Sequence, residues 1–175
     1  MNGGLRVTIL STPLEVAEHA ARAIEEVCAR AAGRRTAVAL SGGRTPAQLF
    51  RILAGRPKGR IPWSDIEVFF GDERAVPPGH PDSNFRLAQE CLFSRVPLPS
   101  GQIHRMCAEE EDLEAAARRY EDEVRRGVPA GPDGVPNSQQ WGNPNQWREF
   151  FCDQEAQRAA QSGLQVQMNV LQIKH

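Results

Sequence analysis

The 175-residue sequence predicts an α/β fold built around a mostly parallel sheet. Short apolar runs suited to buried strands alternate with longer segments whose apolar residues recur at helical spacing. This alternation is typical of strand–helix–strand units with right-handed crossovers. A glycine-rich turn joins one buried strand to the next helix, and folds of this class bind ligands at such turns. The length fits one domain with its own core.

The first predicted elements are a strand over Leu5–Leu10 and a helix that begins near Thr12. Thr12 can cap the helix, Pro13 suits its first position and Glu15 completes a capping box. One apolar face follows at three- and four-residue steps, and Gly33 is a natural stop. That face consists of Leu14, Ala17, Ala21, Ile24, Cys28 and Ala31.

The following segments repeat the alternation of strand and helix. Residues 36–40 predict a buried strand, and a helix is expected to begin at Pro46. Residues 66–70 predict the next strand, which leads into a loop rich in proline and glycine. The sequence then predicts a helix over 83–93, a short strand over 103–106 and a charged helix over 110–126. The inner face of the charged helix would carry Leu113, Ala117, Tyr120 and Val124.

Charge and cysteine content narrow the possible functions. The formal net charge is −1, so neither nucleic acid nor an anionic membrane is expected as a partner, and an anion must be bound by a local site. No apolar run approaches the roughly 18 residues that span a bilayer, and the first nine residues do not resemble a signal peptide. The cysteines are widely spaced, which argues against a zinc site and favours reduced thiols in a cytoplasmic protein. They are Cys28, Cys91, Cys107 and Cys152.

The glycine-rich turn has the sequence Ser41-Gly42-Gly43-Arg44-Thr45-Pro46. Glycines there allow backbone N–H groups to approach an anion closely, and the start of a helix adds unpaired donors and partial positive charge. The hydroxyls of Ser41 and Thr45 are further donors, and Arg44 adds charge if it turns inward. A phosphate is the expected ligand. The alternative is a plain strand-to-helix turn that uses glycine only for its geometry.

A second polar loop, with Asp72-Glu73-Arg74, directly follows the strand predicted over 66–70. The carboxyl ends of parallel strands share one edge of the sheet, so this loop should face the same crevice as the Ser41 turn. Arg74 could hold a phosphate through a two-pronged hydrogen bond, and Asp72 could accept from sugar hydroxyls or orient a water. The alternative is an internal salt bridge in which neighbouring carboxylates occupy Arg74.

Taken together and in this order, the two loops resemble those of the 6-phosphogluconolactonases. The matching positions are S-G-G-x-T-P from Ser41, W-x-x-I from Trp63, F-x-D-E-R-x-V-P from Phe70 and H-x-x-S-N from His80. The resemblance runs from about Val7 to Pro136. It implies a modified doubly wound, Rossmann-like α/β fold, shared with glucosamine-6-phosphate deaminases.

The resemblance also implies an activity and a set of roles. The activity is hydrolysis of 6-phosphogluconolactone to 6-phosphogluconate in the oxidative pentose phosphate pathway, with no metal or organic cofactor. By matching position, the phosphate and sugar pocket is lined by Ser41, Gly42, Gly43, Arg44 and Thr45, with positive charge from Arg74. Asp72 would lie at the reacting end or support it, while Ser83 and Asn84 would hold the loop. Ser83 could also cap the helix that follows.

One expected part of the family pattern is absent from this sequence. Lactonases of this family carry a glycine-rich turn with D-G-H-T, whose histidine is the expected general base, after the acidic helix. Here Asp133-Gly134 is followed by Val135, and no such turn follows Pro136. Because general-base assistance is typically worth about 10²–10⁴ in rate, we expect the chain to have little activity.

The composition changes after Val128. We therefore divide the chain into a partial lactonase-like domain over residues 1–128, a Pro/Gly linker over 129–136 and a divergent tail over 137–175, which holds nine of the twelve glutamines. Truncation, a shifted reading frame or a fusion would each produce such a tail. Besides lactone hydrolysis, three readings stay open: a non-catalytic sugar-phosphate binder, a tail that docks a partner protein, and a deaminase-like enzyme. The oligomeric state is not predicted.

Overall fold

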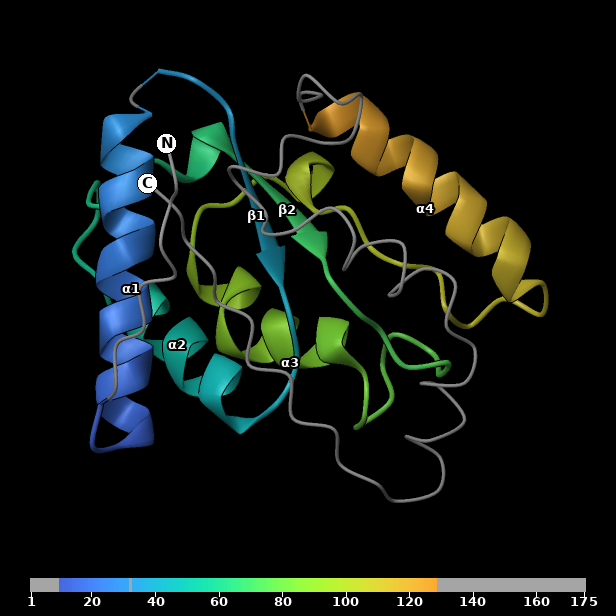
Figure 1. Ribbon diagram of the computed structural model, residues 1–175, viewed down its shortest axis with the longest axis horizontal. Helices are drawn as coiled ribbons and strands as arrows, with labels where there is room; N and C mark the ends of the chain where they lie inside the picture. Colours follow the sequence, from blue (N-terminus) through green and yellow to red (C-terminus); the bar gives the residue numbers. More distant parts are fainter. Residues whose placement is uncertain (1–9, 32, 129–175) are drawn as a thin grey trace, which may run out of the picture.

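A computed structural model describes residues 10–31 and 33–128. The strand predicted over Leu5–Leu10, the linker and the tail lie outside the described residues. In chain order the main elements are α1 (Pro13–Arg30), β1 (Thr36–Leu40), α2 (Arg44–Ala54), β2 (Ile66–Phe70), α3 (Asn84–Cys91) and α4 (Leu113–Gly127) (Figure 1). Both strands within this part of the chain have the bounds that the sequence predicted.

The two strands pair in parallel, from Thr36 opposite Ile66 to Leu40 opposite Phe70. On the other side of β2, Ile103 forms an isolated parallel bridge with Val68, and the N–H of His104 donates to the carbonyl of Val68 at 2.8 Å. The strand predicted over 103–106 is therefore reduced to a single bridge. The predicted α/β fold with a parallel sheet is confirmed.

Helices cover both faces of the sheet because the side chains of β2 alternate between two cores. Ile66, Val68 and Phe70 pack into the larger core with α1, α2 and α3. Phe69 points the other way, into a smaller core with α4. Figure 1 shows α1 and α2 on one side of the strands and α4 on the other, as a doubly wound arrangement requires.

Local capping signals begin three of the helices. The Thr12 hydroxyl accepts from the N–H of Glu15, and Pro13 is the first residue of α1. The Glu15 carboxylate accepts from the N–H of Ser11 at 2.8 Å, one residue before the partner that a capping box would use. Ser83 caps α3, as the sequence suggested, and the Asp112 carboxylate caps α4. Such caps typically stabilise a helix by about 1 kcal/mol.

Two expectations about helices were wrong in detail. Leu14 was assigned to the buried face of α1 but is 57% exposed, since it lies in the first turn, before the helix reaches the core. The buried face instead includes Glu25, whose carboxylate is held by Arg56 at 2.6 Å and Arg60 at 2.7 Å. In addition, α2 begins at Arg44 and not at Pro46, because Gly43 acts as its N-cap.

The buried Tyr120 hydroxyl ties α4 to the carboxyl end of β2. It accepts from the N–H of Phe70 at 2.7 Å and donates to the carbonyl of the same residue at 2.9 Å. Burial raises the pKa of this phenol well above its ordinary value. Because the two backbone groups are satisfied by a side chain, β2 ends at the point where the polar loop begins. Among the described residues, no helix is both long and apolar enough to cross a membrane.

Candidate functional site: a cleft at the carboxyl ends of the strands

The two polar loops leave the sheet at the same edge. Ser41 directly follows β1, and Gly71 directly follows β2. The N–H of Gly71 donates to the carbonyl of Leu40 at 2.8 Å, so the strands stay paired to the point where the loops begin. The parallel register thus brings together two segments about thirty residues apart in the chain.

Direct hydrogen bonds connect the two loops through Asp72. The Ser41 hydroxyl donates to Oδ1 of Asp72 at 2.7 Å. The amide of Asn84, which is buried at the start of α3, donates to Oδ2 of Asp72 at 2.9 Å and to its main-chain oxygen at 3.0 Å. A serine hydroxyl has one proton, so Ser41 uses its only donor on Asp72. The donors of this turn left for an anion are the backbone N–H groups, the Thr45 hydroxyl and Arg44.

Glu73 anchors α3. Its carboxylate accepts from the N–H groups of Asn84 and Phe85, both at 2.8 Å, and from the Ser83 hydroxyl at 3.1 Å. The partial positive charge of the helix start favours a carboxylate at this place. Glu73 is therefore occupied by uncharged donors and does not form the internal salt bridge with the Arg74 side chain that the sequence left open.

Both glycines of the Ser41 turn are required by geometry. A Cβ at Gly42 would lie 1.7 Å from Oδ1 of Asn84, far inside van der Waals contact. Gly43 has φ +109°, which residues with a side chain rarely adopt. No side chain caps α2, so the N–H groups of Arg44 and Thr45 point out of its first turn toward a potential anion.

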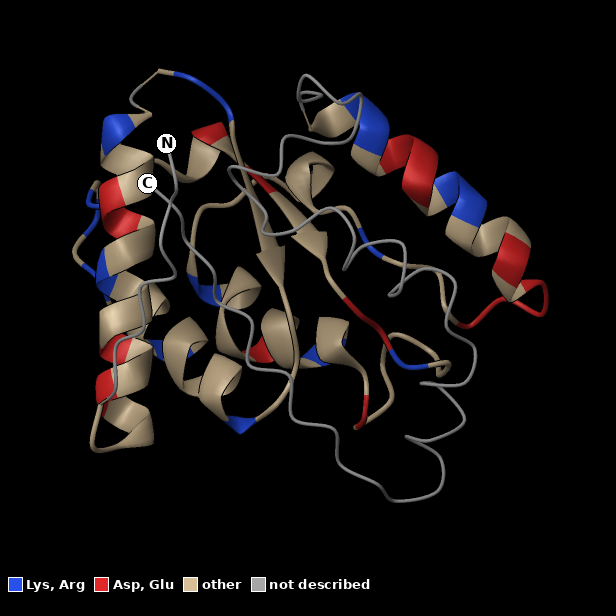
Figure 2. Ribbon diagram, viewed as in Figure 1, with Lys and Arg blue, Asp and Glu red and all other residues tan. Residues whose placement is uncertain are grey.

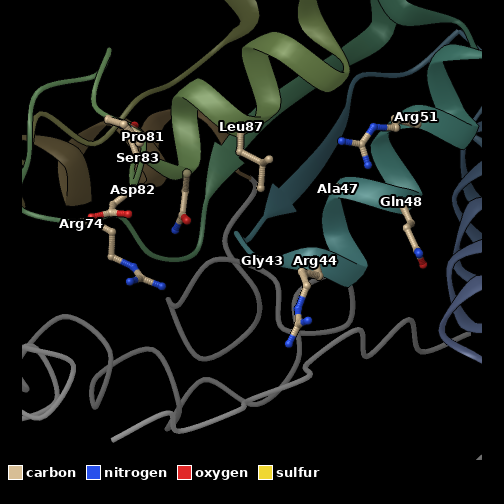
Figure 3. Close-up of a pocket in the computed structure, with 11 residues that line it drawn as sticks. Gly43, Arg44, Ala47, Gln48, Arg51, Arg74, Pro81, Asp82, Ser83 and Leu87 are labelled. Atoms are coloured by element: carbon tan, nitrogen blue, oxygen red, sulfur yellow. The ribbon is translucent and has the colours of Figure 1, made fainter. Parts of the chain in front are cut away.

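The two loops border one open cleft of about 580 Å³. From the first loop and α2 it is lined by Gly43, Arg44, Ala47, Gln48 and Arg51, and from the second loop and α3 by Arg74, Pro81, Asp82, Ser83, Asn84 and Leu87. Figure 3 shows Arg74 reaching from the loop after β2, while Arg44 stands at the start of α2. In Figure 2 the loop after β2 passes from acidic to basic along the chain.

The arginines of the cleft differ from most other described arginines because they have no ion-pair partner. Arg44, Arg51 and Arg74 form no ion pair with any residue in the described ranges. The cleft also contains Asp82, whose carboxylate lies 3.7 Å from Nδ1 of His80. The lining therefore carries a surplus of positive charge that is not neutralised from within, which suits an anionic ligand.

The predicted site residues fall into two groups. Gly43, Arg44 and Arg74 line the cleft, whereas Ser41, Gly42, Thr45 and Asp72 lie outside its lining. Ser41 and Asp72 are bonded to each other, and Gly42 packs against Asn84. Gln48 and Arg51 also line the cleft and were not predicted from the sequence, where the one signal was their spacing of four and seven residues from Arg44 along one helix face.

No histidine lines the cleft in the part of the chain that the structure describes. His104 lies near the amino end of β2, where its Nε2 is 2.9 Å from the Glu67 carboxylate. His80 is in the second loop, and its Nδ1 accepts from the N–H of Asp82 at 3.2 Å. Within residues 10–31 and 33–128, no group of three or more His, Cys, Asp or Glu side chains is arranged to hold a metal ion.

The sequence and the fold were compared with known proteins. The profile of the family described as "Glucosamine-6-phosphate isomerases/6-phosphogluconolactonase" matches residues 11–140. A 6-phosphogluconolactonase of Streptomyces coelicolor is 38% identical over 125 residues, which cover 67% of this chain and 48% of that relative. One of Nostoc sp. is 36% identical over 102 residues, covering 58% of this chain and 41% of the relative.

Solved structures agree with the sequence matches. A 6-phosphogluconolactonase from Thermotoga maritima superposes with a TM-score of 0.60 at 32% identity, covering 70% of this chain and 54% of that chain. The chain thus spans about half the length of the relatives it matches. The part in common contains both loops of the cleft.

Proposed function

Because this chain belongs to the family of glucosamine-6-phosphate isomerases and 6-phosphogluconolactonases, we propose that its cleft binds the phosphate group of a phosphorylated sugar lactone. The reaction that we assign is the hydrolysis of 6-phosphogluconolactone to 6-phosphogluconate, a step of the oxidative pentose phosphate pathway. A cytoplasmic location goes with this assignment. The relatives of this chain that carry the name 6-phosphogluconolactonase support it.

The observation that carries the proposal is the surplus positive charge where the two loops meet. Arg74 from one loop and Arg44 from the other border the same cleft, and neither forms an ion pair with a described residue. A phosphate could accept from the Arg74 guanidinium and from the N–H groups at the start of α2. Each hydrogen bond to a charged group typically contributes about 1.5–3 kcal/mol.

Binding is better supported than catalysis. Lactone hydrolysis requires a water that loses a proton as it attacks the carbonyl, after which the ring C–O bond breaks and the ring oxygen takes up a proton. The Asp72 carboxylate, which joins the two loops, already accepts from Ser41 and Asn84 through its two oxygens. Asp72 is therefore assigned to holding the loops, and the described residues that line the cleft include the Asp82 carboxylate but no histidine.

Calorimetry with 6-phosphogluconate tests the binding proposal. We expect the chain to bind 6-phosphogluconate and to show at least about 10-fold weaker binding of gluconate, which has the same carbon chain but no phosphate. Equal affinity for the two compounds, or no binding of either, would contradict a phosphate site in the cleft.

A turnover assay separates the enzyme from the second candidate, a non-catalytic sugar-phosphate binder. The absence of a histidine from the described cleft lining favours the second candidate for this 175-residue chain. The rate of acid release from fresh 6-phosphogluconolactone, after subtraction of the spontaneous rate, should then be at least about 10²-fold lower than in a relative that carries D-G-H-T. Ammonia release from glucosamine 6-phosphate would instead point to the deaminase branch of the family.

A further inference from the structure

The side chain of Asn84 lies between Asp72 and Gly42, which belong to different loops. Asn84 is 4% exposed, and its amide nitrogen donates to both the carboxylate and the main-chain oxygen of Asp72. The other oxygen of that carboxylate accepts from Ser41. Both oxygens of Asp72 are thus fixed, one by Ser41 of the first loop and one by Asn84 at the start of α3, so the direction of this carboxylate depends on both residues.

The opposite side of the same amide sets the distance to Gly42. Oδ1 of Asn84 occupies the place where a side chain at position 42 would begin, since a Cβ there would be 1.7 Å from it. The backbone of Asn84 is held in turn by Glu73, whose carboxylate accepts from its N–H at 2.8 Å. A chain of contacts therefore runs from the Ser41 turn through Asn84 to the loop that carries Arg74.

We propose that Asn84 is a positioning residue for the phosphate cleft. This inference rests on the proposed function. Asn84 fixes the Asp72 carboxylate and the approach of Gly42, and thereby sets the separation between the N–H donors at the start of α2 and the Arg74 guanidinium. It acts on ligand affinity through these neighbours, because its own amide nitrogen is already used within the protein.

A size-exchange experiment tests the contact with Gly42 without any ligand. We expect Gly42→Ala to lower the midpoint of thermal unfolding by at least about 5 °C. In Gly42→Ala/Asn84→Ala the space is restored, so the midpoint should return to within about 2 °C of Asn84→Ala alone. Gly79→Ala is the matched control, since a Cβ at Gly79 meets nothing within 4 Å. If the two substitutions lower the midpoint additively, Asn84 does not set this distance.

A pH profile tests the contact with Asp72. Asn84→Asp places a second carboxylate opposite Asp72, and like charges that share a site raise the pKa of one of them. We expect 6-phosphogluconate to bind about 10-fold more weakly than to the wild type at pH 7.5, with the difference closing below about pH 5.5 as the pair takes up a proton. A difference that does not change with pH would overturn the role through Asp72.

The two experiments fail in distinguishable ways. If the wild type does not bind 6-phosphogluconate, the proposed function is wrong, and the unfolding measurements still decide whether Asn84 joins the loops. If the wild type binds and Asn84→Ala binds equally well, with less than a 2-fold change, the proposed function stands and the positioning role of Asn84 is wrong.

Discussion

The two ends of β2 hold their carboxylates in different ways. At the amino end, the buried Glu67 accepts from the guanidinium of Arg35 and lies 2.9 Å from the ring nitrogen of His104, which stacks on Phe69. At the carboxyl end, Asp72 and Glu73 accept only from hydroxyl, amide and backbone N–H donors among the described residues.

This difference shows how the same residue types can serve packing at one end and binding at the other. At the amino end the Arg35 guanidinium is paired with Glu67 within the molecule, even though the Arg35 side chain is 76% exposed. At the carboxyl end uncharged donors satisfy the acids, so Arg44 and Arg74 keep their charge available for an external anion. Removing charges from the two ends should therefore have opposite consequences for stability and for ligand binding.

The largest expected effect is on binding, in the double variant Arg44→Ala/Arg74→Ala. Two hydrogen bonds to charged groups, at about 1.5–3 kcal/mol each, correspond to at least about 100-fold weaker binding of 6-phosphogluconate. The unfolding midpoint should stay within about 2 °C of the wild type, because neither side chain has an ion-pair partner in the described structure. Calorimetry and thermal unfolding of one preparation provide both values.

The matched control for this loss is Arg125→Ala. Arg125 lies on α4, where it is paired with Glu121, and Arg125→Ala removes one positive charge, half the change in the double variant, from a residue outside the cleft lining. The affinity of the Arg125→Ala variant for 6-phosphogluconate should equal that of the wild type. A comparable loss in Arg125→Ala would mean that the general charge of the protein, and not the cleft, attracts the ligand.

The next effect is on stability, in Glu67→Gln at the other end of the strand. The amide keeps the shape of the carboxylate but loses its charge-assisted hydrogen bonds with Arg35 and His104. We expect urea unfolding to report a loss of about 1–3 kcal/mol, with 6-phosphogluconate affinity unchanged within 2-fold. Weaker binding at undiminished stability would remove the distinction between the two ends.

A pH effect of smaller size follows from Glu25, another carboxylate neutralised within the molecule. Hydrogen bonding to Arg60, with further help from Arg56, lowers the pKa of Glu25 against the opposing effect of burial. A lowered folded-state pKa contributes stability above about pH 4.5 that is lost as the pH falls through that pKa. The free energy of unfolding, measured with urea, should therefore fall less steeply from pH 7 to pH 3 in Glu25→Gln than in the wild type. Equal slopes would contradict the assignment.

The smallest effect is expected for exposed pairs such as Arg118 with Glu114 on α4. Their side chains are 67% and 71% exposed, and surface ion pairs of this kind are worth about 0–1 kcal/mol. Arg118→Ala should change the unfolding free energy by less than about 0.5 kcal/mol and leave ligand affinity unchanged. A larger loss would show that α4 depends on its surface charges as well as on Tyr120 and Val124.

The sequence predicted the parts of the fold that depend on local patterns. The strands over 36–40 and 66–70, the Thr12 cap and the Ser83 cap each follow from a few adjacent residues, and the structure confirms them. Leu14 was wrong because periodicity assigns residues to a face but does not show where along a helix the core begins. The position of the two loops at one edge of the sheet was also predicted from the sequence, because it follows from parallel pairing of the strands.

The remaining features depend on contacts between distant residues. The Tyr120 hydroxyl meets Phe70 fifty residues away, and the amide of Asn84 fills the space beside Gly42. Whether Arg74 forms an ion pair with Glu73 depends on the direction of the Glu73 carboxylate. The N–H groups at the start of α3 hold that carboxylate through hydrogen bonds. None of these contacts could be predicted from local residue spacing, because each depends on which of several partners the folded chain brings together.

The most direct test of the central claim is a crystal structure of the chain with 6-phosphogluconate. We expect phosphate oxygens within about 3.2 Å of both the Arg74 guanidinium and the backbone N–H groups at the start of α2. A phosphate bound elsewhere, or held by one loop while the other stays out of hydrogen-bonding distance, would contradict it.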